Sequence, residues 1–185
     1  MPRARSVLVA ALSGTLLPAA PVLGQAQAPA TATGTAIAEV VTPIALVREA
    51  DLDFGTVAVS PASGGTVKIV PLAAGASYTG GVDGLCGTAC AMPHAARFAV
   101  QGEPGRAFLI TLPAQLSIPV PGAAPGAVVV VDSLIAASIS APQTGRGILS
   151  NQGRDRFEVG GTLHLPAAAP AAQYTKQVPV IVQYM

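Results

Sequence analysis

Tryptophan is absent from this 185-residue chain, and aromatic residues make up only 4% of it. This absence excludes an antibody-type core, which is built around a tryptophan. Charged residues are also scarce, at 10%, and the formal net charge is +1. Because nucleic acids and anionic membrane surfaces attract domains with a surplus of Lys and Arg, we expect neither as a partner. No apolar run of about 18 residues follows the N-terminal region, so no membrane span is expected.

Recognisable catalytic motifs are missing as well. The sequence has no Gly-x-Ser-x-Gly elbow, His-Glu-x-x-His pair, phosphate-binding glycine loop or calcium loop. We therefore expect no enzyme activity and no cofactor. Asp51 and Asp53 fall on one face of a strand. We expect them to be solubilising surface charges or a turn cap. The alternative is a carboxylate pair that performs acid–base or metal chemistry. His164 alternates with two leucines, so we expect its side chain to face solvent.

The first 26 residues have the pattern of a secretory signal peptide. Arg3 and Arg5 precede the apolar run Ser6–Leu12, and the segment closes on the small residues of Gly24-Gln-Ala26. Cleavage there leaves 185 − 26 = 159 residues, enough for one domain, with eight basic and nine acidic side chains and a net charge of −1. No cysteine near the cut is placed to carry a lipid. We expect export to the periplasm, the cell surface or the medium.

After the signal, apolar residues recur at every second position, and Gly or Pro interrupts them every eight to twelve residues or so. This pattern predicts an all-β domain over residues 36–185, folded as an antiparallel two-sheet β-sandwich with immunoglobulin-like or Greek-key connections. A closed barrel is the alternative. The predicted strands are 36–47 with a break at Pro43, 52–59 with a bulge at Gly55, 66–70, 97–101, 106–112, 115–120, 126–140, 157–165 with a bend at Gly160-Gly161, and 174–185.

The two ends of the mature chain suggest a way to associate. Residues 27–35 are an Ala/Thr-rich leader expected to be flexible, and small residues occupy alternate positions from Ala28 to Val40. Pro179 on one face of the terminal strand is typical of an edge strand, because proline cannot donate to a ladder. The leader is either a linker with a plain N-terminal strand or a strand that adds to the sheet edge of another copy.

Cys86 and Cys90 are the only cysteines and lie in a turn-rich stretch. In an exported protein two cysteines are expected to form a disulfide, although so short a loop constrains little of the unfolded chain. The alternative is a copper site that uses both thiols with His94 and, as a further soft ligand, Met92. That site requires a reductant outside the cytoplasm to keep the thiols reduced.

The order of several short motifs resembles a bacterial secreted family, the domain-of-unknown-function family four-four-zero-two. These motifs are Thr42-Pro-Ile-Ala-Leu, Asp51-Leu-Asp-Phe-Gly55, Phe98–Gly105, Phe108–Pro113, Phe157–Pro166, Tyr174 and Val178–Tyr184. The outline is more remotely similar to spore coat U domains and to chaperone–usher pilin-like subunits. The resemblance implies a β-sandwich of the pilin-like Greek-key type at a surface or in a fimbria. It implies no catalytic residues and gives no role to the cysteine pair.

Three functions remain open from the sequence. The first is an exported, non-enzymatic structural or adhesive protein of the bacterial surface. The most specific version of this function is a subunit of a fimbria-like polymer. Its expected partners are copies of itself and a periplasmic chaperone. The second is a periplasmic copper-binding or redox module that uses Cys86, Cys90 and His94. The third is a monomeric secreted binding domain.

Overall fold

The computed structural model describes residues 30–85, 92–124, 126–142 and 145–185. The chain divides into two units after Ala38, and the compact unit runs from Glu39 to Met185. Within residues 30–38 of the first unit, every residue is exposed and none lies in a strand. The described residues contain no helix with the length and hydropathy needed to cross a membrane. The signal-peptide prediction falls on residues outside the described part of the chain.

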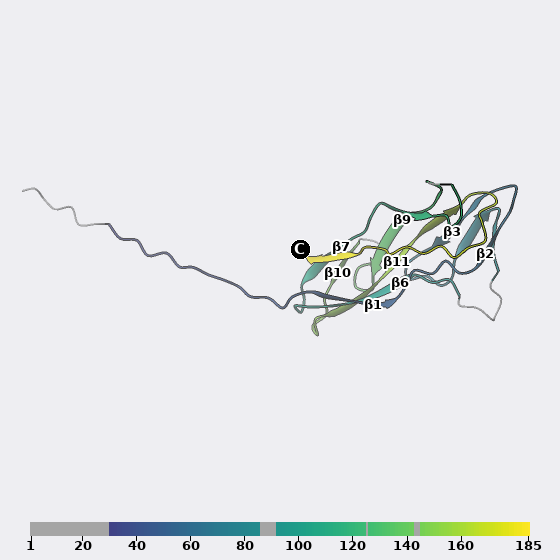
Figure 1. Cartoon of the computed structure of the whole chain (residues 1–185). Helices are drawn as coiled ribbons and strands as arrows, with labels where there is room; N and C mark the ends of the chain where they lie inside the picture. The colour runs from purple at the N-terminus through teal and green to yellow at the C-terminus, as the bar shows by residue number, and fades with distance from the viewer. Residues whose placement is uncertain (1–29, 86–91, 125, 143–144) are drawn as a thin grey trace, which may run out of the picture. The chain divides into compact units, whose positions relative to one another are not determined.

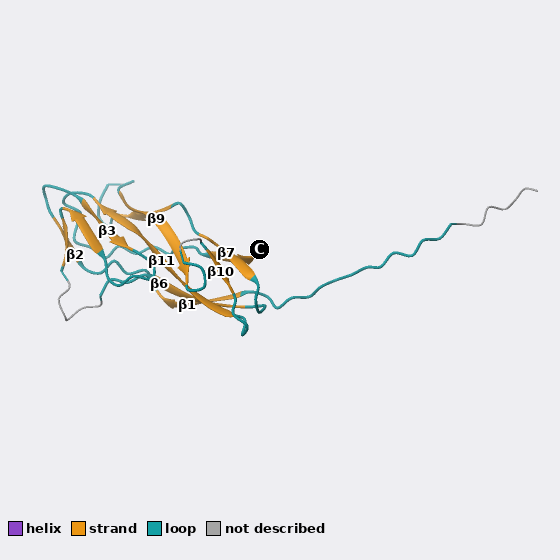
Figure 2. Ribbon diagram, turned by 180° about the vertical axis from the view of Figure 1, so that it is seen from behind, coloured by secondary structure: helices purple, strands orange, loops and turns teal. Residues whose placement is uncertain are grey.

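The compact unit is an all-β, sandwich-like fold in which every strand pairs antiparallel (Figures 1 and 2). Its largest sheet has seven strands, and a three-stranded and a two-stranded sheet accompany it. The strands of the large sheet are β1 (Ala45–Ala50), β3 (Gly65–Ile69), β4 (Ser77–Gly80), β6 (Ala96–Gln101), β8 (Gln115–Pro119), β9 (Val128–Ser138) and β11 (Arg154–Leu165). The three-stranded sheet has the order β10 (Arg146–Ile148), β7 (Ala107–Thr111), β12 (Ile181–Tyr184). The two-stranded sheet consists of β2 (Val57–Val59) and β5 (Val82–Gly84).

Strand β11 organises the large sheet because it pairs along both edges. One edge pairs with β9, and the other pairs first with β6 and then, from Gly161 onward, with β3. The register with β9 shifts between Gly160 and Thr162, which confirms the bend predicted at the glycine pair. A side chain at Gly160 would collide with the backbone of Ile69, so the change of partner requires glycine at this position.

The buried side chains form two neighbouring clusters. The first core lies between the N-terminal half of β11 and β7, and Phe98 and Phe157 stack in it with ring centroids 5.1 Å apart. The second core lies between the C-terminal half of β11, β8, β9 and β3, and Val82 of β5 contributes to it. Each cluster thus has one of the smaller sheets packed against the large sheet.

Several strand boundaries differ from the sequence prediction. The expected strand over 36–47 begins only at Ala45, and the expected terminal strand over 174–185 is limited to β12. In both cases an alternating pattern extends beyond the residues that have a pairing partner. β12 lies at the end of its sheet, which confirms its prediction as an edge strand. β4 and β5 were missed because strands of four and three residues give almost no alternation.

Candidate functional site: an open groove beside β2

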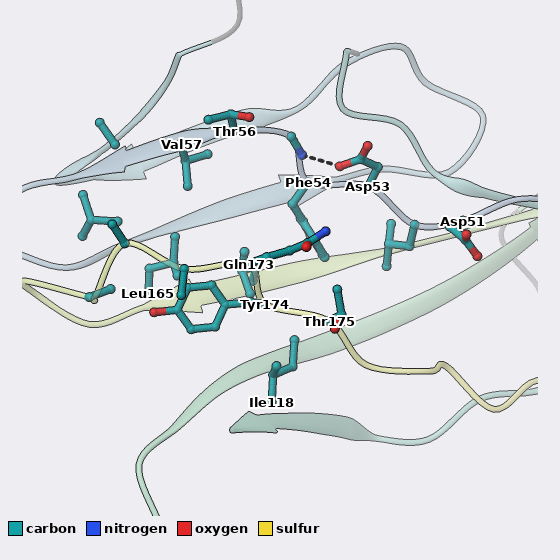
Figure 3. Close-up of a pocket in the computed structure, with 18 of the residues that line it drawn as sticks. Asp51, Asp53, Phe54, Thr56, Val57, Ile118, Leu165, Gln173, Tyr174 and Thr175 are labelled. Carbon is teal, nitrogen blue, oxygen red and sulfur yellow. Dashed lines mark hydrogen bonds between the residues drawn. The ribbon is translucent and has the colours of Figure 1, made fainter. Parts of the chain in front are cut away.

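An open groove of about 1100 Å³ lies over the second core. Ile118, Leu163 and Leu165, all buried core residues, form its floor. One wall is the segment Leu52–Val59, which includes β2, and the other is the segment Ala169–Thr175. Figure 3 shows Phe54 and Val57 extending from the first wall toward the space where Tyr174 lies on the second. The groove therefore lies between two chain segments, over an apolar floor whose side chains are themselves buried.

Local hydrogen bonds set the course of the first wall. Asp53 and His94 exchange both backbone N–H···O bonds, at 2.9 and 3.0 Å. The Asp53 carboxylate accepts a 2.8 Å hydrogen bond from the N–H of Gly55, whose φ of 76° is in the region that favours glycine. The predicted strand over 52–59 is therefore divided at Gly55, and only Val57–Val59 form a strand.

The backbone of the first wall has an unpaired edge. Residues on a strand point their N–H and C=O groups to alternate sides, and Asp53 points toward His94. Leu52 and Phe54 therefore point the opposite way. Beyond Gly55, the bonds from Leu85 N to Thr56 O and from Ser60 N to Gly81 O direct the even-numbered residues toward β5. Val57 and Val59 then point away from β5, and within the described chain their N–H and C=O groups have no partner.

The second wall is also without backbone pairing. In the described structure, no backbone N–H or C=O group of residues 171–179 makes a hydrogen bond. The Tyr174 hydroxyl donates a 2.7 Å bond to the carbonyl of Pro170, which holds this wall in a local loop. Tyr174 and Val178 pack against the second core, while most neighbouring residues are exposed. Two unpaired backbone segments thus border one apolar floor.

The two aspartates considered as a carboxylate pair have separate local partners. The Asp51 carboxylate accepts a 2.7 Å bond from the Arg48 guanidinium in an exposed ion pair. The Asp53 carboxylate is the turn cap on Gly55. Both residues line the groove, but their hydrogen bonds are those of a surface charge and a cap.

The two predicted forms of cysteine chemistry share Cys86 and Cys90. Cys86 and Cys90 lie outside the described residues, so the disulfide and the copper site both stay predictions. His94 lines the groove, and its Nδ1 lies 3.2 Å from the carbonyl of Ala95. Met92 is exposed. Among the described residues, no group of three or more His, Cys, Asp or Glu side chains gathers as a metal site would require.

His164 faces solvent from β11, while Leu163 and Leu165 are buried, as the alternation predicted. Sequence analysis did not find its partner, Asp132 of β9, whose Oδ2 lies 3.1 Å from His164 Nε2. Strand pairing brings these residues together. The hydrogen bond from His164 is the main cause that holds the pKa of Asp132 below its ordinary value. The pair is half-exposed and ties β9 to β11.

Two further polar clusters were missed. The buried Ser138 hydroxyl and the Ser140 hydroxyl donate bonds of 2.5 and 2.6 Å to Asp155 Oδ2, which links the end of β9 to β11. At the other cluster, the Tyr184 hydroxyl accepts a 2.7 Å bond from Glu103 N and donates a 2.7 Å bond to the carbonyl of Thr42. Both clusters join residues far apart in the sequence, so no local pattern predicts them.

The second of these clusters holds the start of the compact unit. The N–H of Thr42 donates a 2.9 Å hydrogen bond to the Glu103 carboxylate, and this bond is the main cause that lowers the pKa of Glu103. Nearby, Arg106 pairs with Glu39 at 3.2 Å. Glu39 and Thr42 are thereby held beside the turn that precedes β7.

Residues 44–184 match the family described as Domain of unknown function (DUF4402), so the match extends from just before β1 to the end of β12. No curated protein and no solved structure matches the chain.

Proposed function

The chain belongs to the DUF4402 family, and from its open groove we propose that it is an exported, non-enzymatic structural or adhesive protein of the bacterial surface that assembles with copies of itself. One observation carries this proposal. Unpaired N–H and C=O groups border a groove with an apolar floor, which is the arrangement that accepts an additional strand. An edge of this kind is normally covered or made unattractive when a protein functions alone.

The composition supports the same function. A surface with few charges suits a protein that packs against copies, because charged residues are depleted at the centres of interfaces. The signal-like N-terminus supports export, which would bring the chain to the compartment where a surface polymer is assembled. During export an unpaired strand edge is an aggregation risk, so a periplasmic chaperone is the second partner that we propose.

Two measurements test the proposal. Intact-mass analysis of protein from a secreting culture is expected to show a chain that begins at Gln27, and retention of Arg3 and Arg5 would contradict export through this signal. Sedimentation velocity and negative-stain microscopy of that mature protein are expected to show oligomers or fibres whose size increases with concentration. A single monomeric species up to millimolar concentration would refute self-assembly and leave the monomeric binding domain.

A further inference from the structure

We propose that the groove beside β2 binds residues 31–38 of a second copy of this chain as an added strand. The inference rests on the proposed self-assembly and goes further by naming the acceptor edge and the donor segment. The sequence pattern indicated the terminal strand as a sheet edge. The structure offers a different unpaired edge within Leu52–Val59, interrupted at Gly55, beside the groove that lies over the second core.

The acceptor edge has free backbone N–H and C=O groups within the described chain, and its side chains pack against the cores. Val57 and Val59 direct their backbone N–H and C=O groups away from β5, and Leu52 and Phe54 direct theirs away from His94. Val57–Val59 form the strand of this wall, about 10 Å long, and Leu52–Phe54 continue the unpaired edge beyond the turn at Gly55, so an added strand would pair along β2 first. The side chains of these four residues pack against the two cores. An added strand would extend the same layer over the groove floor.

The donor segment is the one described stretch that lies outside the compact unit. Residues 31–38 are exposed, belong to no strand and carry no charged side chain. Threonine and isoleucine favour extended chain, and no proline interrupts residues 31–38. The segment therefore has the composition of a strand that lacks a partner.

Alternation decides which face of the donor meets the floor. One face presents Ala32, Gly34, Ala36 and Ala38, and the other presents Ile37 and three threonines. A threonine hydroxyl against Leu163 and Leu165 would lose its hydrogen bonds with water, so the small-residue face is the one that turns inward. Small side chains also let the donor backbone approach a floor that large side chains already fill.

The chain cannot supply this strand to its own groove while its N-terminal contacts hold. Glu39 is paired with Arg106, and Thr42 is bonded to Glu103 and Tyr184. From Thr42 the chain enters β1, which runs about 17 Å from Ala45 to Ala50, where the groove begins. Ala38 precedes Glu39 in the chain, so it stays near Arg106 as long as Glu39 is paired there. To fill the chain's own groove, Ala38 would have to lie at one end of that groove instead. Only a second copy can place residues 31–38 there without breaking these contacts.

A pair of neighbouring lysine substitutions tests the donor. Gly34→Lys puts a charged side chain on the inward face, and Thr33→Lys puts the same charge on the outward face. A side chain at Gly34 meets no atom within 4 Å, and Thr33 is exposed, so neither change should disturb the folded domain. In sedimentation velocity on the full mature chain, we expect Gly34→Lys to raise the assembly concentration by at least about tenfold and Thr33→Lys by no more than about twofold.

Hydrogen exchange tests the acceptor. The amides of Val57 and Val59 should exchange at least about tenfold more slowly in assembled wild-type protein than in dilute monomer. Adding a synthetic peptide of residues 30–41 to the Gly34→Lys protein should restore that protection, because this variant keeps an intact groove. A peptide with the same Gly34→Lys change is the matched control and should give no protection.

Each other result overturns part of the argument, and the failures differ. A wild-type protein that never assembles refutes the proposed function and this inference together. Assembly that both lysine variants leave intact, or weaken equally, refutes residues 31–38 as the donor and leaves the proposed function standing. Assembly without protection of Val57 and Val59 refutes the acceptor edge. Protection of both amides in the monomer shows that the chain closes its own edge.

Discussion

Replacing Tyr184 by phenylalanine should weaken the junction between the C-terminal strand and the start of the compact unit. The change keeps the ring in the first core but removes the 2.7 Å bonds to Thr42 O and from Glu103 N. A hydrogen bond contributes about 0.5–1.5 kcal/mol net, and water can replace part of it because the hydroxyl is not fully buried. We therefore expect a loss of about 1–2 kcal/mol in the free energy of unfolding.

Thermal unfolding measures this loss. For a domain of this size about 1 kcal/mol corresponds to about 2–4 °C, so Tm should fall by about 2–8 °C. Tyr78→Phe is the matched control, because the hydroxyl of Tyr78 makes no hydrogen bond within the described chain, and it should change Tm by less than about 1 °C. Equal Tm values for wild type and Tyr184→Phe would refute the view that this junction stabilises the domain.

Three further outcomes are expected. Phe157→Ala removes a fully buried ring from the first core and should destabilise the domain by about 3–5 kcal/mol in denaturant unfolding, and a loss below about 1 kcal/mol would contradict the core assignment. Because the folded pKa of Glu103 is lowered, its ionised form stabilises the fold above its ordinary pKa, and this contribution is lost as pH falls through the folded pKa. The Tm difference between wild type and Glu103→Gln should thus shrink between pH 7 and pH 3, and a constant difference would exclude this cause. Thiol labelling of exported protein should find Cys86 and Cys90 oxidised, whereas two free thiols that bind copper would favour the metal site.

The sequence was most informative for strands of five or more residues inside the domain. Period-two alternation predicted five strands to within a few residues: β6, β7, β8, β9 and β11. Successive side chains of a strand point to opposite faces, so burial of one face makes every second residue apolar. The same reasoning predicted the bend at Gly160-Gly161 and the exposure of His164. These properties depend on local chemistry and on which face is apolar.

The same pattern was misleading at the two ends of the chain. Alternation over 36–44 and over 174–180 predicted strands that the compact unit does not contain, since a strand exists only where a neighbour pairs with its backbone. The sequence records the side chains of such a segment but not whether its N–H and C=O groups have a partner. In this protein the segments that alternate without a backbone partner are the stretch before β1 and part of one wall of the groove.

The sequence by itself determined the fold class, the positions of the long strands and the absence of familiar catalytic motifs, because these follow from composition and local periodicity. The tertiary structure alone decided where backbone pairing stops. The open edge at Val57 and Val59, the apolar floor of Ile118, Leu163 and Leu165, and the anchoring of Thr42 all depend on residues brought together from distant parts of the chain. No local pattern contains that information, because it resides in the contacts between strands.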